Sequence, residues 1–454
     1  MNLAQAIRVS GSEAVAFVGA GGKTTALFQL ARQLKPPVIL STTTHLGISQ
    51  AVLADHHIII RSPEDLNKIK DSISPLVTLV TGEANQEGRL RGLPSDLMKQ
   101  LFGIVKENGI PFLIEADGSR QRPLKAPGDH EPSIPNFVDL VVLIVGLSGL
   151  EKPLSSVWVH RPERFAQISG LESGQTITCE ALERVLTSPT GGLKGIPEGC
   201  RRIVMMNQAD TSKLQAQAQR MSNSLLKSFA AICVTSLEIL NEPGLAPEDD
   251  LNARLTVSAV HERVAGIILA AGGSRRFGKP KQILTWKGEP FIKQVMSTAL
   301  KAGLSPIILV TGAHHEQISK LVDEEGIQVV YNPEWESGQS TSVRAGLNVL
   351  DPNVGGAVFL LADQPQIPVT LIRAMVELHA STLSPIIAPM VKGQRATPVL
   401  FDRSTFADFA LIEGDQGGRT LFARNPVRWL EWQDESILLD VDSPEDYHRL
   451  INQT

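Results

Sequence analysis

A short apolar stretch that opens into a glycine-rich, cationic loop constrains this chain more than any other feature of its sequence. Residues 267–269 are Ile-Ile-Leu and read as a buried strand. The glycines of the loop that follows are Gly272, Gly273 and Gly278. Backbone N–H groups at glycines can approach an anion without a Cβ in the way, and Arg276 and Lys281 add fixed positive charge. The loop therefore predicts a triphosphate site at the carboxyl edge of a parallel sheet, and the alternative is a turn with two solvated cations.

Acidic residues follow later strand-like stretches of the same half. Residues 356–361 form an apolar run that leads to Asp363, where a strand-end carboxylate is placed to bind Mg²⁺. Asp442 precedes an expected helix and offers a second metal ligand, and Asp440 is an alternative for that role. Transfer at an α-phosphorus concentrates negative charge, which metal and cations stabilise without a covalent intermediate. We therefore expect nucleotidyl transfer, with Arg276, Lys281 and Asp363 as catalytic residues.

The motif Leu-Ala-Ala-Gly-x-Ser-x-Arg-Phe-Gly-x-x-Lys at 269–281 resembles the signature of the molybdenum cofactor nucleotidyltransferases, in particular their cytidylyltransferase (MocA-like) branch. The resemblance covers about 265–454 and includes segments at 393–401 and 414–419, although Ala396 and Thr397 replace the Gly-His that is common in the family. It implies a Rossmann-like domain that transfers CMP from CTP to molybdopterin and releases pyrophosphate. The residues that it implies for nucleotide binding are Ala270, Ala271, Gly272, Gly273, Gly278, Lys281, Gln339, Ser340 and Ser342.

A second glycine loop lies near the start of the chain. Residues 14–18 read as a buried strand, and Gly-Ala-Gly-Gly-Lys-Thr-Thr follows at 19–25 before a helix to about Leu34. This order is the plan of a phosphate-binding loop, except that Phe17 stands where the usual pattern has its first glycine, so the loop is shortened. The residues that this pattern assigns to nucleotide binding are Gly19, Gly21, Gly22, Lys23, Thr24 and Thr25. Thr24 is also a predicted magnesium ligand.

Polar residues at two further strand ends belong to the same pattern. The stretch 112–114 leads to Glu115 and Asp117, and Asp117 is predicted to join Thr24 at the metal. Asn207 and Asp210 form an Asn-x-x-Asp segment that reads guanine in many GTPases. Gln208 replaces the usual lysine, so both ATP and GTP stay open.

A cationic loop at 119–127 carries Arg120, Arg122 and Lys125. Such a loop suits an anionic ligand or is simply solvated.

The first half of the chain resembles the selenium-dependent molybdenum hydroxylase accessory proteins of the YqeC family. The segments that carry this resemblance are Gly-Ala-Gly-Gly-Lys-Thr-Thr, Thr-Thr-Thr-His, Glu-Ala-Asp-Gly-Ser-Arg, Pro-Leu-Lys-Ala-Pro and Val-His-Arg-Pro-Glu. This resemblance covers about 10–235. It implies a role in maturation, with an apo molybdenum hydroxylase as the client.

The length of 454 residues exceeds one ordinary core, and the Pro, Gly and acidic residues of 241–262 indicate a boundary there. We therefore expect an α/β chain with a P-loop NTPase-like domain at 1–258 and a Rossmann-like nucleotidyltransferase domain at 263–454. A net charge of −5 gives no reason to expect nucleic acid. The absence of a signal peptide, a long apolar run and paired cysteines favours a cytoplasmic protein without a membrane partner.

The expected function is a bifunctional maturation enzyme that uses Mg²⁺ and CTP in its second half and ATP or GTP in its first. Two other possibilities stay open. One is transfer of GMP, or activation of a sugar phosphate, by the same fold. The other is a nucleotide-switched factor that loads finished molybdenum cofactor into a client enzyme.

Overall fold

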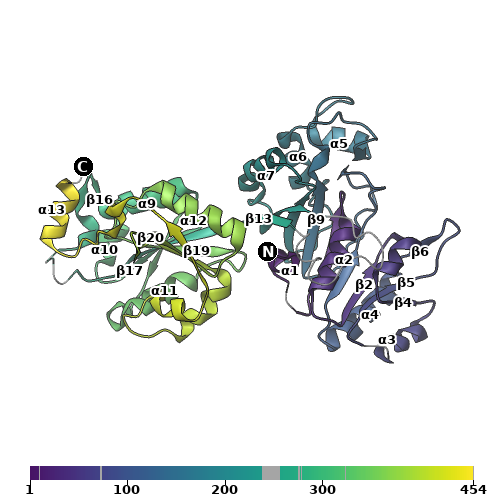
Figure 1. Cartoon of the computed structure of the whole chain (residues 1–454), viewed down its shortest axis with the longest axis horizontal. Coiled ribbons are helices and arrows are strands. Elements are labelled where there is room, and N and C mark those ends of the chain that lie inside the picture. The colour runs from purple at the N-terminus through teal and green to yellow at the C-terminus, as the bar shows by residue number, and fades with distance from the viewer. Residues whose placement is uncertain are drawn as a thin grey trace. The chain divides into compact units, whose positions relative to one another are not determined.

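The computed structural model of the chain describes residues 1–9, 11–71, 74–237, 256–274, 277, 279–322 and 324–452. They form two compact units, 1–261 and 262–454 (Figure 1). The strand β13 (Thr256–Glu262) pairs into the first sheet, so the first unit extends past the residue 258 at which the sequence places its end. Arg276 and Gly278 of the predicted nucleotide site lie outside the described residues.

The first unit is built on a sheet of nine strands in the order β13-β12-β11-β9-β1-β7-β2-β5-β4. Its strands besides β13 are β1 (Ala14–Gly19), β2 (Val38–Thr42), β4 (His56–Ile59), β5 (Val77–Thr81), β7 (Phe112–Glu115), β9 (Leu140–Gly146), β11 (Arg201–Asn207) and β12 (Ala231–Ser236). All pairings from β12 to β4 are parallel. Every residue of β1 and β9 is buried, which is the pattern of a parallel sheet covered on both faces.

Helices and short elements surround this sheet. The helices are α1 (Leu3–Ile7), α2 (Lys23–Gln33), α3 (Asn67–Asp71), α4 (Ser95–Glu107), α5 (Pro162–Ser169), α6 (Cys179–Thr187) and α7 (Ser212–Leu225). The short elements are η1 (Ile48–Leu53), η2 (Pro63–Leu66), η3 (Leu147–Gly149), β3 (His45–Gly47), β6 (Arg89–Arg91), β8 (Leu124–Lys125) and β10 (Val159–His160). The helix α2 packs on β1, β2 and β7, so its N-terminus is fixed directly beyond the end of β1.

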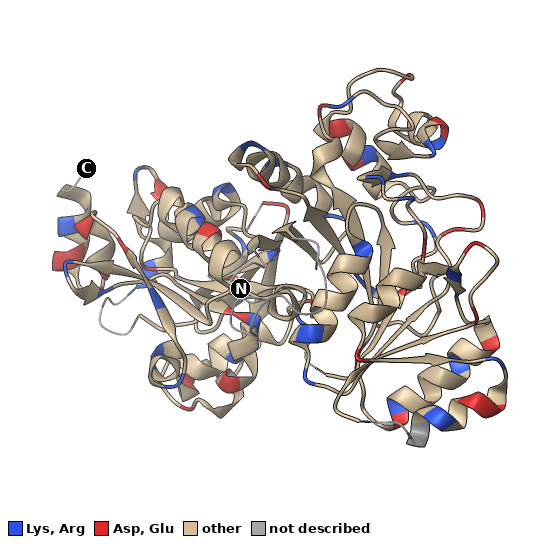
Figure 2. Ribbon diagram, turned by 45° about the vertical axis from the view of Figure 1, so that its right-hand side comes forward, with Lys and Arg blue, Asp and Glu red and all other residues tan. Residues whose placement is uncertain are grey.

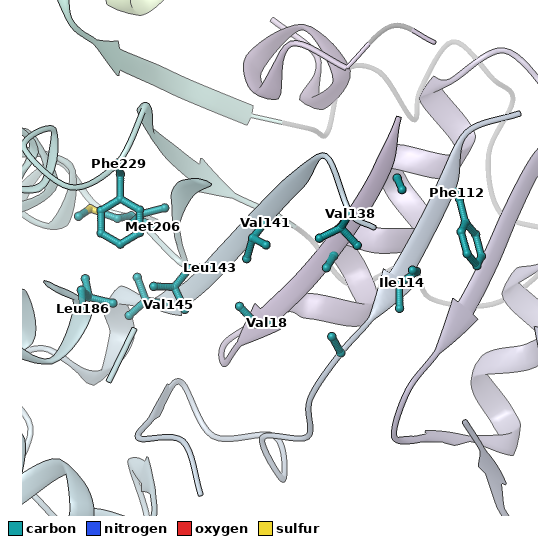
Figure 3. Packing of buried hydrophobic residues seen from close by; sticks show 14 of the residues in the cluster. Val18, Phe112, Ile114, Val138, Val141, Leu143, Val145, Leu186, Met206 and Phe229 are labelled. Atoms are coloured by element: carbon teal, nitrogen blue, oxygen red, sulfur yellow. The ribbon is translucent and has the colours of Figure 1, made fainter. Parts of the chain in front are cut away.

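One hydrophobic cluster lies between the sheet of the first unit and the helices α4, α5, α6 and α7. Val141, Leu143 and Val145 alternate along β9 and point to the same face, as Figure 3 shows. Met206 and Phe229 extend this cluster to the elements beyond β9. The strand ends that carry polar residues are therefore held by a continuous apolar core.

The second unit is built on an eight-stranded mixed sheet in the order β18-β17-β14-β19-β22-β20-β21, with β23 paired to β20. Its strands are β14 (Val264–Ala270), β17 (Ile307–Thr311), β18 (Ile327–Tyr331), β19 (Gly356–Leu361), β20 (Ile386–Val391), β21 (Gln394–Arg395), β22 (Val399–Asp402) and β23 (Val427–Glu431). The strands from β18 to β19 are parallel, whereas β22 runs antiparallel to β19. The parallel strands bring the ends of β14 and β19 to the same edge.

Two apolar clusters cover opposite faces of this sheet. Ile268 and Leu309 belong to one cluster, and their neighbours Ile267 and Ile308 belong to the other. The helices α9 (Phe291–Ala302) and α12 (Val369–Thr382) contribute to the first cluster, and α11 (Gln339–Leu347) and η6 (Arg403–Leu411) to the second (Figure 1). The remaining elements are α10 (His315–Ser319), α13 (Pro444–Asn452), η4 (Lys281–Ile283), η5 (Trp335–Ser337), η7 (Gly418–Ala423), η8 (Glu435–Leu438), β15 (Thr285–Trp286) and β16 (Glu289–Pro290). This three-layer arrangement is the α/β, Rossmann-like organisation that the sequence predicts.

Charged residues of both signs are scattered over the helices and loops of each unit, while the sheets are mostly uncharged (Figure 2). No helix among the described residues combines the length and the hydropathy that crossing a bilayer requires.

Candidate functional site

A cavity of about 530 Å³ lies at the carboxyl ends of β14 and β19 in the second unit. The predicted residues that line it are Ala271, Gly272, Gly273, Lys281, Gln339, Ser342, Asp363 and Asp442. Two other predicted residues are buried beside it without lining it: Ala270 ends β14, and Ser340 lies in the first turn of α11. The fold thus gathers residues from four separate segments around one opening.

The ammonium of Lys281 joins two carboxylates at this cavity. Its Nζ lies 2.8 Å from Oδ2 of Asp363 and 2.7 Å from Oδ1 of Asp442. These partners are 82 and 161 residues away along the chain. Burial alone would lower the pKa of Lys281, but the two carboxylates outweigh burial and raise it. Lys281 is therefore a stable cation held between two anions.

Asp440 occupies a different position from Asp442. The amide Nε2 of Gln364 donates to Oδ1 of Asp440, and Oγ1 of Thr397 donates to Oε1 of Gln364 at 2.6 Å. Burial, reinforced by the nearby charge of Asp363, raises the pKa of Asp440. Of the two acids that the sequence leaves open as metal ligands, only Asp442 contacts Lys281 among the described ion pairs.

A second cavity of about 170 Å³ adjoins the first. The two share Leu269, Gln339 and Leu361 as lining residues. Aromatic rings form much of the second wall, and the rings are those of Phe359, Phe401, Phe409 and Phe422. Arg395 and Arg419 line the same cavity, and the guanidinium of Arg395 lies 4.7 Å from the Phe422 ring centroid. This cavity suits a flat ring with an anionic arm.

The loop at 414–419 connects the two cavities. Gly338, at the start of α11, has φ of 113°, and a Cβ there would lie 2.3 Å from the carbonyl carbon of Gly414. Only glycine permits this approach, because both the backbone angle and the space exclude a side chain. The loop then places Asp415 in the first cavity and Arg419 in the second.

Trp335, which no sequence motif indicates as a site residue, forms part of the wall of the first cavity. A Cβ on Gly273 would lie 3.2 Å from its indole, and a Cβ on Gly312 would lie 2.7 Å from its Cβ. Two glycines far apart in sequence thus make room for one ring. Trp335 follows Asn-Pro-Glu in a segment without periodicity, so only the tertiary structure shows its place.

In the first unit, the loop between β1 and α2 is held closely by neighbouring strands. Gly22 caps α2 with φ of 126°, and a Cβ there would lie 2.4 Å from Nδ2 of Asn207. That amide donates to the carbonyl of Gly21 at 2.8 Å. No side chain caps α2, so its first N–H groups stay available to an anion.

Lys23 begins α2 and is buried beside this loop. Its Nζ donates to the carbonyl of Gly19 at 2.8 Å and lies 3.2 Å from Oδ1 of Asp117. The other oxygen of Asp117 accepts from the Gly19 N–H at 3.0 Å and from Lys125 Nζ at 2.8 Å. Lys125 also pairs with Glu131 at 2.6 Å. Asp117 therefore stabilises the β1–α2 loop through its contacts with Gly19 and Lys23.

The acid that reaches Thr24 is Glu115 rather than Asp117. Oγ1 of Thr24 donates to Oε2 of Glu115 at 2.8 Å. Burial raises the pKa of Glu115, and the charge of Lys23 partly opposes this. The metal pair predicted from the sequence was Thr24 with Asp117, and Glu115 lay outside it. Thr25 follows within the first turn of α2.

The other polar residues that the sequence analysis singles out in the first unit are partly buried and partly exposed. Oδ1 of Asn207 accepts from the backbone N–H of Leu237 at 2.9 Å, so both ends of its amide support the fold. Asp210 is exposed and bonds to Ser236. In the cationic loop, Arg120 and Arg122 are exposed. The side chain of Lys125 is only 3% exposed, so the solvated-loop interpretation is wrong for it.

Among the described residues, no cluster of three or more His, Cys, Asp and Glu side chains forms a ready-made metal site. Each unit instead offers a smaller set at the edge of its sheet, Thr24 with Glu115 and Asp363 with Asp442. Such sets suit a cation that also binds phosphate oxygens.

Comparison with known proteins places each unit in a family. Residues 15–163 match the YqeC protein family, and residues 266–429 match the MobA-like NTP transferase domain. The chain is 34% identical over 199 residues to the uncharacterized protein YqeC of Escherichia coli K12, which is 43% of this chain and 75% of that protein.

Further relatives include proteins of purine catabolism and molybdenum cofactor metabolism. The purine catabolism protein PucB of Bacillus subtilis is 30% identical over 40% of this chain and 93% of its own length. The molybdenum cofactor cytidylyltransferase of Escherichia coli K12 is 26% identical over 40% of this chain and 92% of its own length. The chain therefore belongs to both families, as a fusion of a YqeC domain with a nucleotidyltransferase domain of the MobA-like family.

Proposed function

We propose that the second unit transfers CMP from CTP to molybdopterin and releases pyrophosphate. The observation that carries this proposal is the cation Lys281 between Asp363 and Asp442 at a cavity that adjoins an aromatic second cavity. The relationship to a molybdenum cofactor cytidylyltransferase supports the choice of substrates. The direct test is pyrophosphate release from purified protein with molybdopterin, CTP and Mg²⁺. Release that does not depend on molybdopterin would contradict the proposal.

The residues of the first cavity suit a magnesium-bound nucleotide. Two carboxylates that approach a single cation within 2.8 Å are a suitable pair for Mg²⁺, which otherwise uses phosphate oxygens and water. Asp363 and Asp442 would hold the ion, which when bound neutralises charge on the phosphates. Lys281 and the N–H groups at 271–273 bind and orient the triphosphate in this proposal. Arg276 of the same loop is proposed to add charge.

The second cavity is proposed to hold the acceptor. Its phenylalanine rings pack on a flat heterocycle, and Arg395 and Arg419 hold the anionic arm. A phosphate oxygen of the acceptor then attacks the α-phosphorus in line. The new bond is between that oxygen and phosphorus, and the broken bond is the one to the departing pyrophosphate. The shared wall at Gln339 is where the two substrates meet.

CTP is expected to exceed GTP as the donor by at least tenfold in kcat/KM, a difference of about 1.4 kcal/mol. A few hydrogen bonds at the base edge supply that difference, and Gln339 and Ser342, which line the cavity, are the residues proposed to make them. The measurement is initial-rate pyrophosphate release with each nucleotide over a range of concentrations. Equal turnover, or a preference for GTP, would contradict the cytidylyl assignment while the fold assignment stands.

Gly272→Val is expected to weaken CTP binding at least tenfold without loss of stability. A Cβ at Gly272 meets no atom within 4 Å, and the residue lines the first cavity, so the new side chain projects toward the ligand. Surface changes of this kind usually alter stability by less than about 0.5 kcal/mol. The measurement is calorimetric CTP titration together with thermal unfolding. Gly103→Val, which also meets no atom within 4 Å, serves as the control in the first unit. Unchanged CTP affinity would exclude this loop from the nucleotide site.

We further propose that the first unit binds a nucleoside triphosphate at the β1–α2 loop, with Thr24 and Glu115 as its magnesium pair. The uncapped start of α2, Lys23 and the Thr24–Glu115 hydrogen bond support this proposal. Asn207 supports the loop, and Asp210 is exposed at the same edge of the sheet. Delivery of finished cofactor to an apo molybdenum hydroxylase is the proposed role of this unit.

A further inference from the structure

We propose that Lys281 occupies the position of the divalent cation until a nucleotide arrives, so that metal and nucleotide bind the second unit tightly only together. This inference rests on the proposed nucleotide site of that unit. It adds a coupling between two ligands that the residues of the site themselves impose.

The Lys281 ammonium lies where a divalent cation held by Asp363 and Asp442 would bind. The Lys281 ammonium lies 2.8 Å from an oxygen of Asp363 and 2.7 Å from an oxygen of Asp442. An Mg²⁺ ion bound by the same two carboxylates needs their oxygens at about 2.0–2.1 Å. The two cations would therefore compete for one space, and Lys281 has to leave when the ion binds.

A metal ion that displaces the Lys281 ammonium also removes the anionic partners of that ammonium. The Lys281 side chain is only 14% exposed, and its described ion-pair partners are these two carboxylates. An ammonium that loses its anions in a largely buried place is strongly destabilised. A metal ion alone therefore binds against this cost. The triphosphate removes the cost, because its oxygens give Lys281 new partners in the same cavity.

A nucleotide that arrives without metal meets the carboxylates of the first cavity. The described residues that line the first cavity include four carboxylates, those of Glu336, Asp363, Asp415 and Asp442, and one cation, Lys281. Negative charge predominates among these described residues and the lysine is already paired, so they favour a triphosphate less when no metal accompanies it. Each ligand thus lowers the cost of binding the other, and this coupling must be reciprocal.

The test is a titration of the full chain with Mn²⁺, with and without CTP, in which electron paramagnetic resonance measures the bound ion. In the wild type, CTP is expected to tighten Mn²⁺ binding at least tenfold. Lys281→Ala is expected to bind Mn²⁺ without nucleotide at least tenfold more tightly than wild type, and CTP then adds little. Lys279→Ala, an exposed lysine of the same loop, is the matched control and should behave as wild type. Asp363→Asn identifies the part of the signal that comes from this site rather than from the first unit.

The proposal is overturned if Lys281→Ala binds Mn²⁺ no more tightly than Lys279→Ala does, provided that thermal unfolding shows both to be folded. Lys281→Met, which keeps the apolar stem, replaces the alanine variant if the latter does not fold. GTP is titrated in parallel, so a wrong nucleotide preference does not obscure the coupling. Absence of CMP transfer to molybdopterin would contradict the proposed function and leave the Mn²⁺ result unaffected.

Discussion

Asp363→Asn is expected to lower CMP transfer at least a hundredfold while the protein stays folded. The amide keeps the shape of the side chain but removes the charge that faces Lys281 at 2.8 Å and that would hold Mg²⁺. One charge pair at 4 Å and an effective dielectric of about 20 is worth roughly 4 kcal/mol, or about a thousandfold in rate. The carboxylate is 26% exposed, so solvent reduces this effect and a hundredfold is the lower bound that we expect.

The measurement is kcat/KM for pyrophosphate release, with thermal unfolding on the same preparation. Asp351→Asn is the control, since this carboxylate pairs with Arg263 at 2.7 Å and does not line the described part of either cavity. A folded Asp363→Asn protein that keeps more than a tenth of wild-type kcat/KM would place the metal elsewhere. Asp442 and Asp440 would then be the next carboxylates to replace.

Lys23→Ala is expected to weaken triphosphate binding by the first unit at least a hundredfold, while CMP transfer by the second unit stays within twofold of wild type. Lys23 is the cation nearest the loop, with its Nζ on the Gly19 carbonyl and on Asp117. Asp117 keeps Lys125 as a partner at 2.8 Å in the variant, so the buried carboxylate is not left without a cation. The loss should therefore fall mainly on ligand binding.

Binding of ATP and GTP is measured in the Gly272→Val background, which weakens the site of the second unit. Lys35→Ala, an exposed lysine just after α2, is the control. Activation of an apo molybdenum hydroxylase is followed on the same preparation and should fail if the first unit delivers the cofactor. If Lys23→Ala stops pyrophosphate release although the protein is folded, the two sites are coupled and the proposed division of labour is wrong.

Some strand positions were predictable because the strand is a short continuous apolar run that is followed by a glycine-rich or acidic segment. Residues 14–18 and 356–361 show this pattern, and the strands lie at Ala14–Gly19 and Gly356–Leu361. The family of each unit could also be predicted from the sequence, since the glycine loops at 19–25 and 269–281 carry distinctive residue combinations. Local sequence determines these features because they depend on neighbouring residues alone.

The partners of each polar group depend on the tertiary structure instead. Glu115 and Asp117 lie two residues apart, and the sequence predicted Asp117 as the partner of Thr24. In the structure Glu115 contacts Thr24, while Asp117 contacts Gly19, Lys23 and Lys125. Asp440 and Asp442 separate in the same way, because the segment before α13 turns one toward Gln364 and the other toward Lys281. The place of Trp335 in the cavity wall depends on Gly273 and Gly312, whose missing side chains leave space for its ring. Local sequence was enough to predict the α/β class of the chain, the family of each unit and the positions of the polar strand ends. Which of these side chains meet is set by strand order and packing rather than by local pattern. Lys281, for example, contacts two acids that lie 82 and 161 positions further along the chain.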